Sequence, residues 1–364
     1  MVEASKLKAW ISAARLRTLP LSVSGILVGS AFAYLSIHQF NLAQPKLNMF
    51  QEVDAYNQLT QDIQNKVSEA LSLYLNDFSF LIPILALITT LGFQILSNFA
   101  NDYGDGVKGT DNEDRIGPMR AIQSGIISPK EMKRGIIITA VLTLISAVLL
   151  IYISLGIDRL LISLFFLVLG IAAIWAAIKY TVGDNAYGYR GLGDVFVFIF
   201  FGPISVMGIF YLITKVVDWD MIFPSITIGL LSVAVLNLNN MRDVESDKKA
   251  GKNTIVVKMG LKKAKLLHRV MIVIALFCSL RLAGNIYYTK YIANGIGKLG
   301  MVENKNIYLV AFLPLLAFIP LFIHLIKVKK TKSPALLDPE LKKVALSTFL
   351  FAILCMVSVW VLTL

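Results

Sequence analysis

Nine long apolar stretches are the feature that most constrains how this chain can fold. A helix that spans a bilayer needs about 20 mostly apolar residues. Stretches of this kind occupy 19–37, 78–100, 135–155, 158–178, 192–213, 221–238, 267–285, 307–326 and 343–364. Of the 364 residues, 56% are hydrophobic and only 16% are charged, whereas soluble domains average about 25% charged. The pattern therefore predicts an all-α polytopic membrane protein with nine transmembrane helices.

The rest of the composition excludes several kinds of site. The two cysteines, Cys278 and Cys355, lie inside apolar stretches, and two cysteines are too few for a disulfide scaffold or a cysteine-based zinc site. The three histidines, His38, His268 and His324, are far apart in the sequence, which argues against a histidine metal cluster. The net charge of +12 can indicate nucleic-acid binding, but the high apolar content favours a membrane.

The basic residues are distributed unevenly among the loops, and this predicts an orientation. If the N-terminus is cytoplasmic, the inner segments hold 27 of the 35 Lys and Arg residues and the outer segments hold 7. Cytoplasmic loops of membrane proteins carry an excess of Lys and Arg, and the lipids that face them are anionic. We therefore expect a cytoplasmic N-terminus and a C-terminus outside.

One polar segment interrupts the apolar pattern. We expect residues 38–77 to form an extracytoplasmic insertion within a single transmembrane domain that comprises residues 1–364. From Val53 to Leu75, apolar residues recur at helical spacing, which fits an amphipathic helix lying on the outer membrane surface. A solvated loop fits this segment equally well.

Two predicted inner loops carry matching clusters of Asn and Asp at the ends of apolar stretches. Residues three or four positions apart share one face of a helix, so each cluster is expected to place its side chains together. A carboxylate near hydrocarbon costs about 2.5–3.5 kcal/mol, so each cluster needs a cation. Mg²⁺ prefers oxygen ligands and binds carboxylates together with substrate phosphates. The matching residues are Asn98, Asp102 and Asp105 in the first cluster and Asn239, Asp243 and Asp247 in the second.

Basic residues accompany both acidic clusters. Lys108 and Arg120 follow the first cluster, and Arg242 and Lys252 lie in or after the second. A metal-bound diphosphate site requires such residues, because Arg binds phosphate oxygens in a bidentate manner. Solvated acids balanced by neighbouring lysines, and basic residues that only set the orientation, are the alternative interpretation. The matching of two clusters favours the metal site and suggests a parallel internal repeat.

Four strings of sequence near these clusters carry a family resemblance. They are Arg-Leu-Arg-Thr-Leu-Pro at 15–20, Asn-Asp-Tyr-Gly-Asp-Gly-Val-Lys-Gly-Thr-Asp at 101–111, Tyr-Gly-Tyr-Arg-Gly-Leu-Gly-Asp at 187–194 and Asn-Leu-Asn-Asn-Met-Arg-Asp at 237–243. Together they resemble the UbiA superfamily of intramembrane aromatic prenyltransferases. The third Asp of the superfamily pattern is replaced here by Gly109, and Asp111 stands in for it. This shift resembles the branch that acts on 1,4-dihydroxy-2-naphthoate in menaquinone synthesis.

The resemblance implies a fold and a reaction. The fold is nine helices around a central cavity, with both acidic clusters facing each other at its cytoplasmic mouth. The implied reaction transfers a polyprenyl group from an allylic polyprenyl diphosphate to 1,4-dihydroxy-2-naphthoate, with loss of carbon dioxide and diphosphate, on the way to demethylmenaquinone. The alternative is another aromatic acceptor, 4-hydroxybenzoate or homogentisate. The implied cofactor is Mg²⁺, and the implied location is the bacterial cytoplasmic (inner) membrane, with the active site open toward the cytoplasm.

The resemblance and the charge pattern together assign roles to individual residues. The expected catalytic residues are Asp102, Asp105, Asp243 and Asp247. Asn98, Asp102 and Asp105 are expected to hold one Mg²⁺, and Asp243 and Asp247 a second, with Asn239 and Asp111 as further contributors. The expected diphosphate-binding residues are Lys108, Arg120, Arg242 and Lys252. The acceptor candidates are Arg17, Lys179, Tyr180, Arg190 and Asp194. Arg17 and Arg190 fit equally well as residues that only set the orientation.

Overall fold

The computed structural model describes residues 2–49, 78–109, 119–297 and 305–364, and these residues form helices without strands. Nine of the described helical segments are long and apolar enough to cross a membrane, and each of them overlaps one of the nine predicted stretches. The prediction of an all-helical chain with nine candidate membrane spans is confirmed.

The helical elements follow one another along the whole described chain. They are α1 (Val2–Ala14), η1 (Leu16–Thr18), α2 (Leu19–Met49), α4 (Leu81–Val107), α5 (Pro129–Leu155), α6 (Leu160–Lys179), η3 (Tyr187–Arg190), α7 (Gly193–Ile199), the π-helical turn η4 (Phe200–Ile204), α8 (Ser205–Thr214), η5 (Trp219–Met221), α9 (Ile222–Arg242), α10 (Val244–Lys249), α11 (Ile255–Gly297), η6 (Lys305–Phe318), α12 (Ile319–Lys330), η7 (Pro334–Leu337) and α13 (Asp338–Thr363). The π-helical turn contains Pro203 and joins α7 to α8 within one membrane-length segment.

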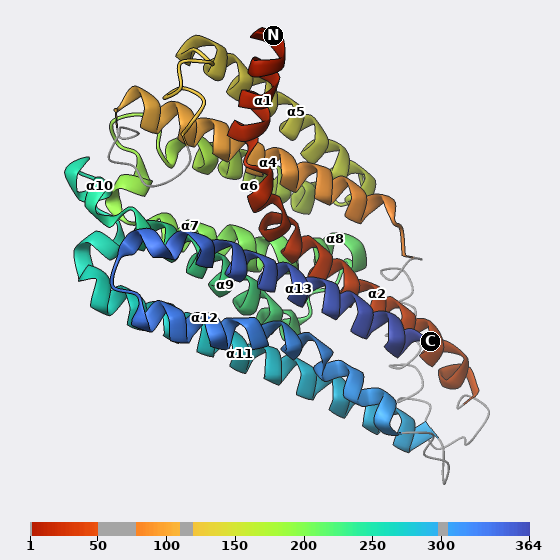
Figure 1. Ribbon diagram of the computed structural model, residues 1–364. Helices are drawn as coiled ribbons and strands as arrows, with labels where there is room; N and C mark the ends of the chain where they lie inside the picture. Colours follow the sequence, from red (N-terminus) through yellow and green to blue (C-terminus); the bar gives the residue numbers. More distant parts are fainter. Residues whose placement is uncertain (1, 50–77, 110–118, 298–304) are drawn as a thin grey trace.

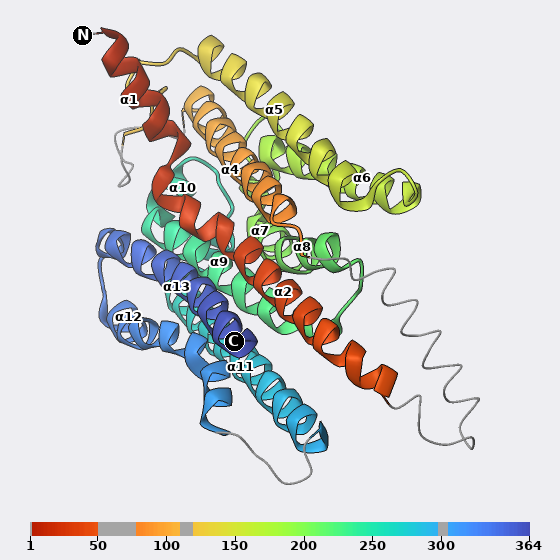
Figure 2. The same cartoon turned by 90° about the vertical axis from the view of Figure 1, so that its right-hand side faces the viewer.

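The long helices form two groups. In one group α4, α5 and α6 pack against one another, and in the other α9, α11, α12 and α13 pack together (Figures 1 and 2). Helix α2 contacts both groups through α4 and α13, and it also packs along α8. Helix α10 and the C-terminal end of α4 lie at the same end of the bundle (Figure 1), so the fold brings the two acidic clusters to one end.

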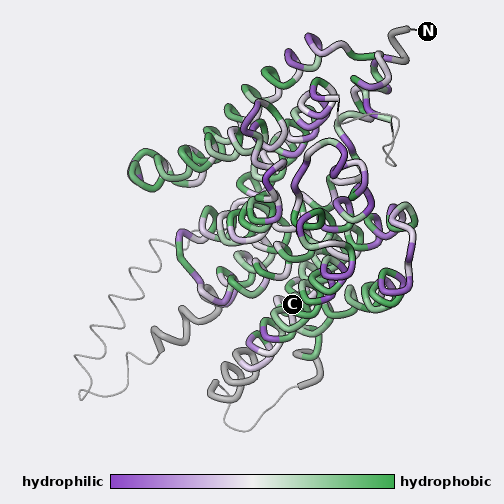
Figure 3. The backbone as a smooth tube through the Cα atoms, turned by 90° about the vertical axis from the view of Figure 1, so that its left-hand side faces the viewer, coloured by the Kyte–Doolittle hydropathy of each residue, from purple (hydrophilic) through white to green (hydrophobic). Residues whose placement is uncertain are grey.

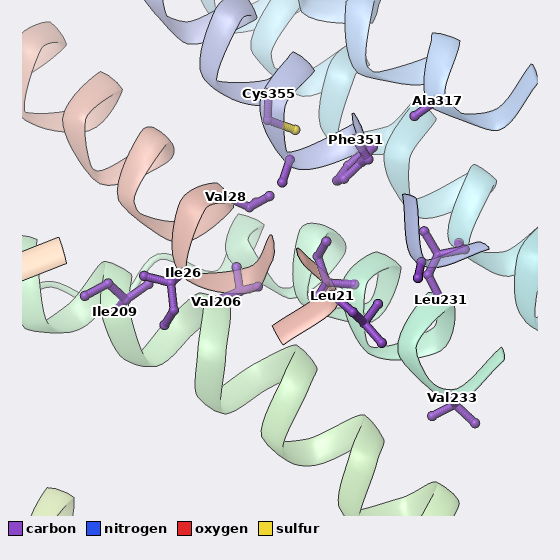
Figure 4. Packing of buried hydrophobic residues seen from close by; sticks show 14 of the residues in the cluster. Leu21, Ile26, Val28, Val206, Ile209, Leu231, Val233, Ala317, Phe351 and Cys355 are labelled. Atoms are coloured by element: carbon purple, nitrogen blue, oxygen red, sulfur yellow. The ribbon is translucent and has the colours of Figure 1, made fainter. Parts of the chain in front are cut away.

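Apolar side chains fill the space where α2, α8, α9 and α13 meet. Figure 4 shows this contact at close range, with Ile26 and Val28 of α2 near Val206 and Ile209 of α8. Cys355 is fully buried in the same cluster, where a small apolar side chain fits. Burial of such side chains contributes about 25 cal/mol per Å² of apolar surface removed from water.

The outer faces of the helices are apolar as well. Hydrophobic residues cover the middle of the long helices, and hydrophilic residues gather toward the helix ends on the side that carries the N-terminus (Figure 3). In α6, Leu161, Phe165 and Val168 are exposed. Such exposure is unusual for large apolar side chains in water, but it is what a helix in contact with lipid requires.

The first acidic cluster lies on one continuous helix, as predicted. Asn98, Asp102 and Asp105 all belong to α4 and are 3%, 2% and 1% exposed. The prediction of a single helix for the second cluster is wrong. Helix α9 ends at Arg242, and Asp243, with φ −96° and ψ 12°, separates it from α10. Asp competes with the helical backbone for hydrogen bonds and therefore favours helix ends.

The predicted insertion at 38–77 is described only in its first part. Helix α2 continues without interruption to Met49, so residues 38–49 extend the first apolar helix. The expected amphipathic helix from Val53 to Leu75 lies outside the described residues.

Two glycines allow α2 to approach α8 closely. A Cβ atom at Gly25 would lie 2.2 Å from the Ser205 hydroxyl oxygen, and one at Gly29 would lie 2.3 Å from the carbonyl oxygen of Val206. Small residues four positions apart are the usual means by which membrane helices pack at short distance. The pair therefore fixes α2 against the helix that lines the cavity described below.

Gly29→Ala should lower the thermal stability of the detergent-solubilised protein, because the added methyl group meets backbone that cannot move aside. Overpacking of this kind costs about 1–3 kcal/mol. Gly284→Ala in α11 is the control, since a Cβ there meets no atom within 4 Å. Equal melting temperatures for the two variants would contradict this account of the α2–α8 contact.

Candidate active site

Asp105 of α4 is the buried carboxylate on which most of the site converges. Arg120 Nη1 lies 3.0 Å from Asp105 Oδ2, and the Tyr189 hydroxyl donates to Asp105 Oδ1 at 2.8 Å. Lys252 Nζ lies 4.0 Å from the same carboxylate. Arg120 also donates to the carbonyl oxygen of Asn101 at 2.9 Å, which fixes its guanidinium against α4. A carboxylate that is 1% exposed requires such partners to stay charged.

Lys252 connects the two acidic clusters. Its ammonium lies 3.9 Å from Asp247 Oδ1 and 4.0 Å from Asp105 Oδ2. Burial lowers the pKa of Lys252, but the two carboxylates outweigh burial and the net pKa is raised. Burial raises the pKa of Asp247 to about 6, although Lys252 acts in the opposite direction. The charge on Asp247 is therefore costly unless a cation lies beside it.

The ring of Tyr189 in η3 lies near the ammonium groups of two lysines. Lys108 Nζ lies 4.1 Å from the centre of the Tyr189 ring, and Lys252 Nζ lies 5.4 Å from it. The carbonyl oxygen of Tyr189 also accepts a hydrogen bond from the Asn253 backbone at 2.9 Å. Burial lowers the pKa of Lys108, and Asp105 partly offsets this effect. One tyrosine thus contacts both sides of the site through its ring, hydroxyl and backbone.

Asp102 and Asn98 make contacts of another kind. Both oxygens of Asp102 accept backbone hydrogen bonds, from Ala121 at 3.1 Å and from Ile122 at 3.3 Å. These bonds hold the turn that carries Arg120. The amide of Asn98 donates to the carbonyl oxygen of Ala14 at 2.8 Å. In these contacts Asp102 and Asn98 fix the chain segments on either side of α4.

Asp243 and Arg242 form a pair at the end of α9. Arg242 donates from Nε to Asp243 Oδ1 at 2.8 Å and from Nη2 to Asp243 Oδ2 at 2.6 Å. Its third nitrogen, Nη1, lies 2.5 Å from Asp338 Oδ1. Arg242 is only 3% exposed, so its guanidinium faces acidic side chains of the protein.

A cavity of about 340 Å³ lies next to the two acidic clusters. Its wall is formed by residues of α2 and of the helices from α4 to α9. One asparagine from each acidic cluster, Asn98 and Asn239, lines it. Its other polar lining includes Arg15, Thr18, Gln94, Asn101 and Tyr180. Most of the remaining wall is apolar and includes Phe166, Phe200 and Leu212. The cavity thus combines polar groups contributed by the helix ends with an apolar wall.

No group of three or more His, Cys, Asp or Glu side chains close enough to hold a metal ion occurs among the residues that the structure describes. The acids come together in smaller sets, and the loop with Asp111 lies outside the described residues. Burial raises the pKa of Asp247, and nearby Asp243 and Asp105 raise it further, so the three carboxylates affect one another electrostatically. Their oxygen atoms are the kind of ligand that Mg²⁺ prefers.

Comparison with known proteins identifies the family. The sequence profile of the UbiA prenyltransferase family matches residues 70–337. The chain belongs to the UbiA prenyltransferase family. It is 38% identical over 349 residues, 96% of this chain and 94% of the relative, to a 1,4-dihydroxy-2-naphthoate octaprenyltransferase of Haemophilus influenzae. It is 41% identical over 274 residues, 75% of this chain and 76% of the relative, to the Escherichia coli protein of the same name.

A solved structure supports the same fold for this UbiA-family chain. The structure of a UbiA homologue from Archaeoglobus fulgidus, bound to DMAPP and Mg²⁺, superimposes with a TM-score of 0.50. The alignment covers 95% of this chain and 98% of the homologue at 16% sequence identity. The likeness concerns the fold, and it extends over nearly the whole length of both chains.

The residues that were predicted to bind the acceptor do not all lie at the cavity of this UbiA-family structure. Tyr180 lines the cavity, and burial raises its pKa. Asp194 is buried one residue after Gly193, which lines the cavity. Lys179 and Arg190 are exposed, and Arg190 donates to Asn185 at 2.5 Å. The side chain of Arg17 lies outside the described residues.

The sequence did not single out some residues that the structure brings to the site. Arg15 lines the cavity, and its backbone has a left-handed conformation with φ 52°, which is costly for a residue other than glycine. Gln94 of α4 also lines the cavity. The Arg-Leu-Arg-Thr string and the Tyr-Gly-Tyr string were the available signals, but neither showed that Tyr189 bonds Asp105.

Proposed function

We propose that this UbiA-family enzyme transfers a polyprenyl group from an allylic polyprenyl diphosphate to 1,4-dihydroxy-2-naphthoate in menaquinone biosynthesis. In this reaction the allylic C–O bond breaks and diphosphate leaves. A C–C bond forms at the ring carbon that carries the carboxylate, carbon dioxide is lost, and the electrons of the broken C–C bond return to the ring. The naphthoate relatives from two organisms, at 38% and 41% identity, support this acceptor over 4-hydroxybenzoate or homogentisate.

The carboxylates of the two acidic clusters fit Mg²⁺. Asp105 and Asp247 lie close enough to share one ammonium group, and Asp243 lies on the same side of the bundle as Asp247. We assign the metal to these three, Asp102 and Asn98, with Asn239 and Asp111 as further ligands. Bound Mg²⁺ supplies Lewis-acid neutralisation of the diphosphate. For Asp102 and Asn98, the present hydrogen bonds to backbone would have to rearrange.

The protein's own cations complete the site for a diphosphate. Lys252, Arg120 and Lys108 are arranged around Asp105 and Tyr189, and cations placed where negative charge develops lower the barrier to its formation. We propose that these three residues contact the departing diphosphate. Arg242 was also predicted to contact the diphosphate, but its nitrogens bond Asp243 and Asp338.

The cavity suits both organic substrates. Its apolar wall can accommodate a polyprenyl chain, and its polar residues can orient an aromatic acid. We propose that this is the central cavity of the fold and that Tyr180 and Arg15 face the acceptor, with Arg17, Lys179, Arg190 and Asp194 as the remaining candidates. The distribution of basic residues supports a cytoplasmic N-terminus, a C-terminus outside, and a site that opens to the cytoplasm of a bacterial inner membrane. We also propose one transmembrane domain over 1–364 with an extracytoplasmic insertion at 38–77.

One observation carries the proposal: carboxylates from two matching clusters converge on Lys252 next to a cavity lined by an asparagine from each cluster. The test is a membrane assay with a polyprenyl diphosphate and either 1,4-dihydroxy-2-naphthoate, 4-hydroxybenzoate or homogentisate, with Mg²⁺ or EDTA. We expect a prenylated, decarboxylated product from the naphthoate alone, and none with EDTA. Product from another acceptor, or full activity in EDTA, would contradict the proposal.

A further inference from the structure

The N-terminal end of α13 reaches the second acidic cluster through one ion pair. Asp338, the first residue of α13, bonds Arg242 Nη1 at 2.5 Å across 96 positions of sequence. The sequence motifs assign no role to this aspartate. The turn η7, which precedes it, packs against α9.

The geometry of Arg242 makes it a connector between two acids. Its Nε and Nη2 grip both oxygens of Asp243, while Nη1 bonds Asp338. A guanidinium is planar and presents its donors in fixed directions, so the position of Asp338 sets the plane in which Asp243 lies. Asp243 lies between α9 and α10. Its backbone is held by hydrogen bonds to the Asn239 carbonyl oxygen at 3.0 Å and from the Asp247 amide at 2.8 Å, so Arg242 acts on the direction of the carboxylate rather than on the backbone.

Asp338 is held in turn by a buried polar network two residues further along α13. Glu340 is fully buried and bonds Lys327 at 2.9 Å, Lys343 at 2.8 Å and His324 Nδ1 at 2.7 Å. His324 Nε2 lies 2.7 Å from His268 Nε2. This network joins α11, α12 and α13 and holds the first turn of α13 against the two neighbouring helices.

We propose that Asp338 is a positioning residue that, through Arg242, fixes the carboxylate of Asp243 for metal binding. The inference rests on the proposed Mg²⁺-dependent prenyl transfer. Groups that hydrogen-bond to metal ligands or orient them affect metal affinity strongly, and their loss typically lowers it about 10- to 100-fold. Arg242 then serves Asp243, and the diphosphate is left to Lys108, Arg120 and Lys252.

The test measures Mn²⁺ binding to the detergent-solubilised protein by EPR, without substrate, and the Mg²⁺ concentration that gives half-maximal prenyl transfer. Asp338→Asn should weaken Mn²⁺ binding and raise that Mg²⁺ concentration about tenfold or more, with little change in KM for the acceptor. Asp338→Glu, which keeps the charge, should restore part of the loss. Asp158→Asn is the control, because Asp158 is an exposed acid in the turn before α6.

A double-mutant cycle separates positioning from mere stabilisation of α13. Arg242→Lys keeps the charge but removes the planar fork, so Asp338→Asn should add little further loss in that background. If the two losses multiply, or if Asp338→Asn binds Mn²⁺ as the wild type does, the positioning role is wrong. Failure of the proposed function looks different, because the wild type itself would then form no prenylated product. Melting temperatures identify variants that do not fold. If Asp338→Asn does not fold, Asp338→Glu takes its place in the comparison with the wild type.

Discussion

Asp105→Asn should reduce prenyl transfer by about 100- to 1000-fold, the range found when one group that stabilises charge at a reacting centre is removed. The substitution keeps the shape of the side chain but removes its charge. Arg120 and Lys252 then lose the carboxylate that they share, and the proposed metal site loses a negatively charged ligand. The two cations would repel each other, and each would keep its other contacts, including the Asn101 carbonyl oxygen for Arg120 and Asp247 for Lys252.

Initial rates at saturating Mg²⁺, together with the melting temperature, check this prediction. Asp158→Asn is a suitable control, because Asp158 is an exposed acid in the turn before α6 with no proposed role in the chemistry. A normal melting temperature with a lost rate would support a direct role. An Asp105→Asn enzyme that retains more than about a tenth of the wild-type rate would show that the site centres elsewhere.

The membrane spans could be predicted from the sequence because the hydrocarbon core imposes a length on them. Some helix ends could not. Helix α4 continues to Val107 and α11 starts at Ile255, well outside the apolar stretches. Beyond the hydrocarbon, a helix keeps its own hydrogen bonds whatever the polarity of its side chains, so hydropathy no longer marks its end. The polar extension of α4 carries Asp102 and Asp105.

The members of the candidate site could be predicted in part from charge. Matched acids with nearby basic residues indicated that Asp105, Asp247 and Lys252 belong together. In the structure the ammonium of Lys252 lies within about 4 Å of both carboxylates. The bonds of Asp102 to backbone amides at Ala121 and Ile122 depend on the shape of a turn. Helix periodicity carries no information on such a turn.

Contacts between residues that are far apart in the sequence could not be predicted for a different reason. His268 and His324 appeared unrelated because 56 residues separate them, yet their rings share a hydrogen bond. Asp338 likewise reaches Arg242 from a helix that the apolar pattern placed only by its hydrophobic part. Packing of α9, α11, α12 and α13 decides these pairs, and a single sequence shows no pairing between helices.

Lys252→Met should raise the KM for the polyprenyl diphosphate about 30-fold or more, because loss of one member of a buried, paired charge cluster typically costs 2–5 kcal/mol. Lys252 is the cation that lies between the two acidic clusters, and its side chain is only 12% exposed. Methionine has similar length and fills the same space without charge. The carboxylates of Asp105 and Asp247 would then face each other with one cation fewer, which disfavours an anionic substrate.

Lys258→Met provides the matched control for Lys252→Met. Lys258 lies six residues further along, is exposed, and donates only to the carbonyl oxygen of Arg190 at 2.7 Å. The effect of Lys252→Met should appear in the KM for the diphosphate more than in that for the naphthoate, since we propose that the acceptor binds in the cavity rather than beside Lys252. Equal changes in both KM values would indicate that Lys252 stabilises the loop rather than the bound diphosphate. Unchanged KM values would show that Lys252 does not contact the diphosphate.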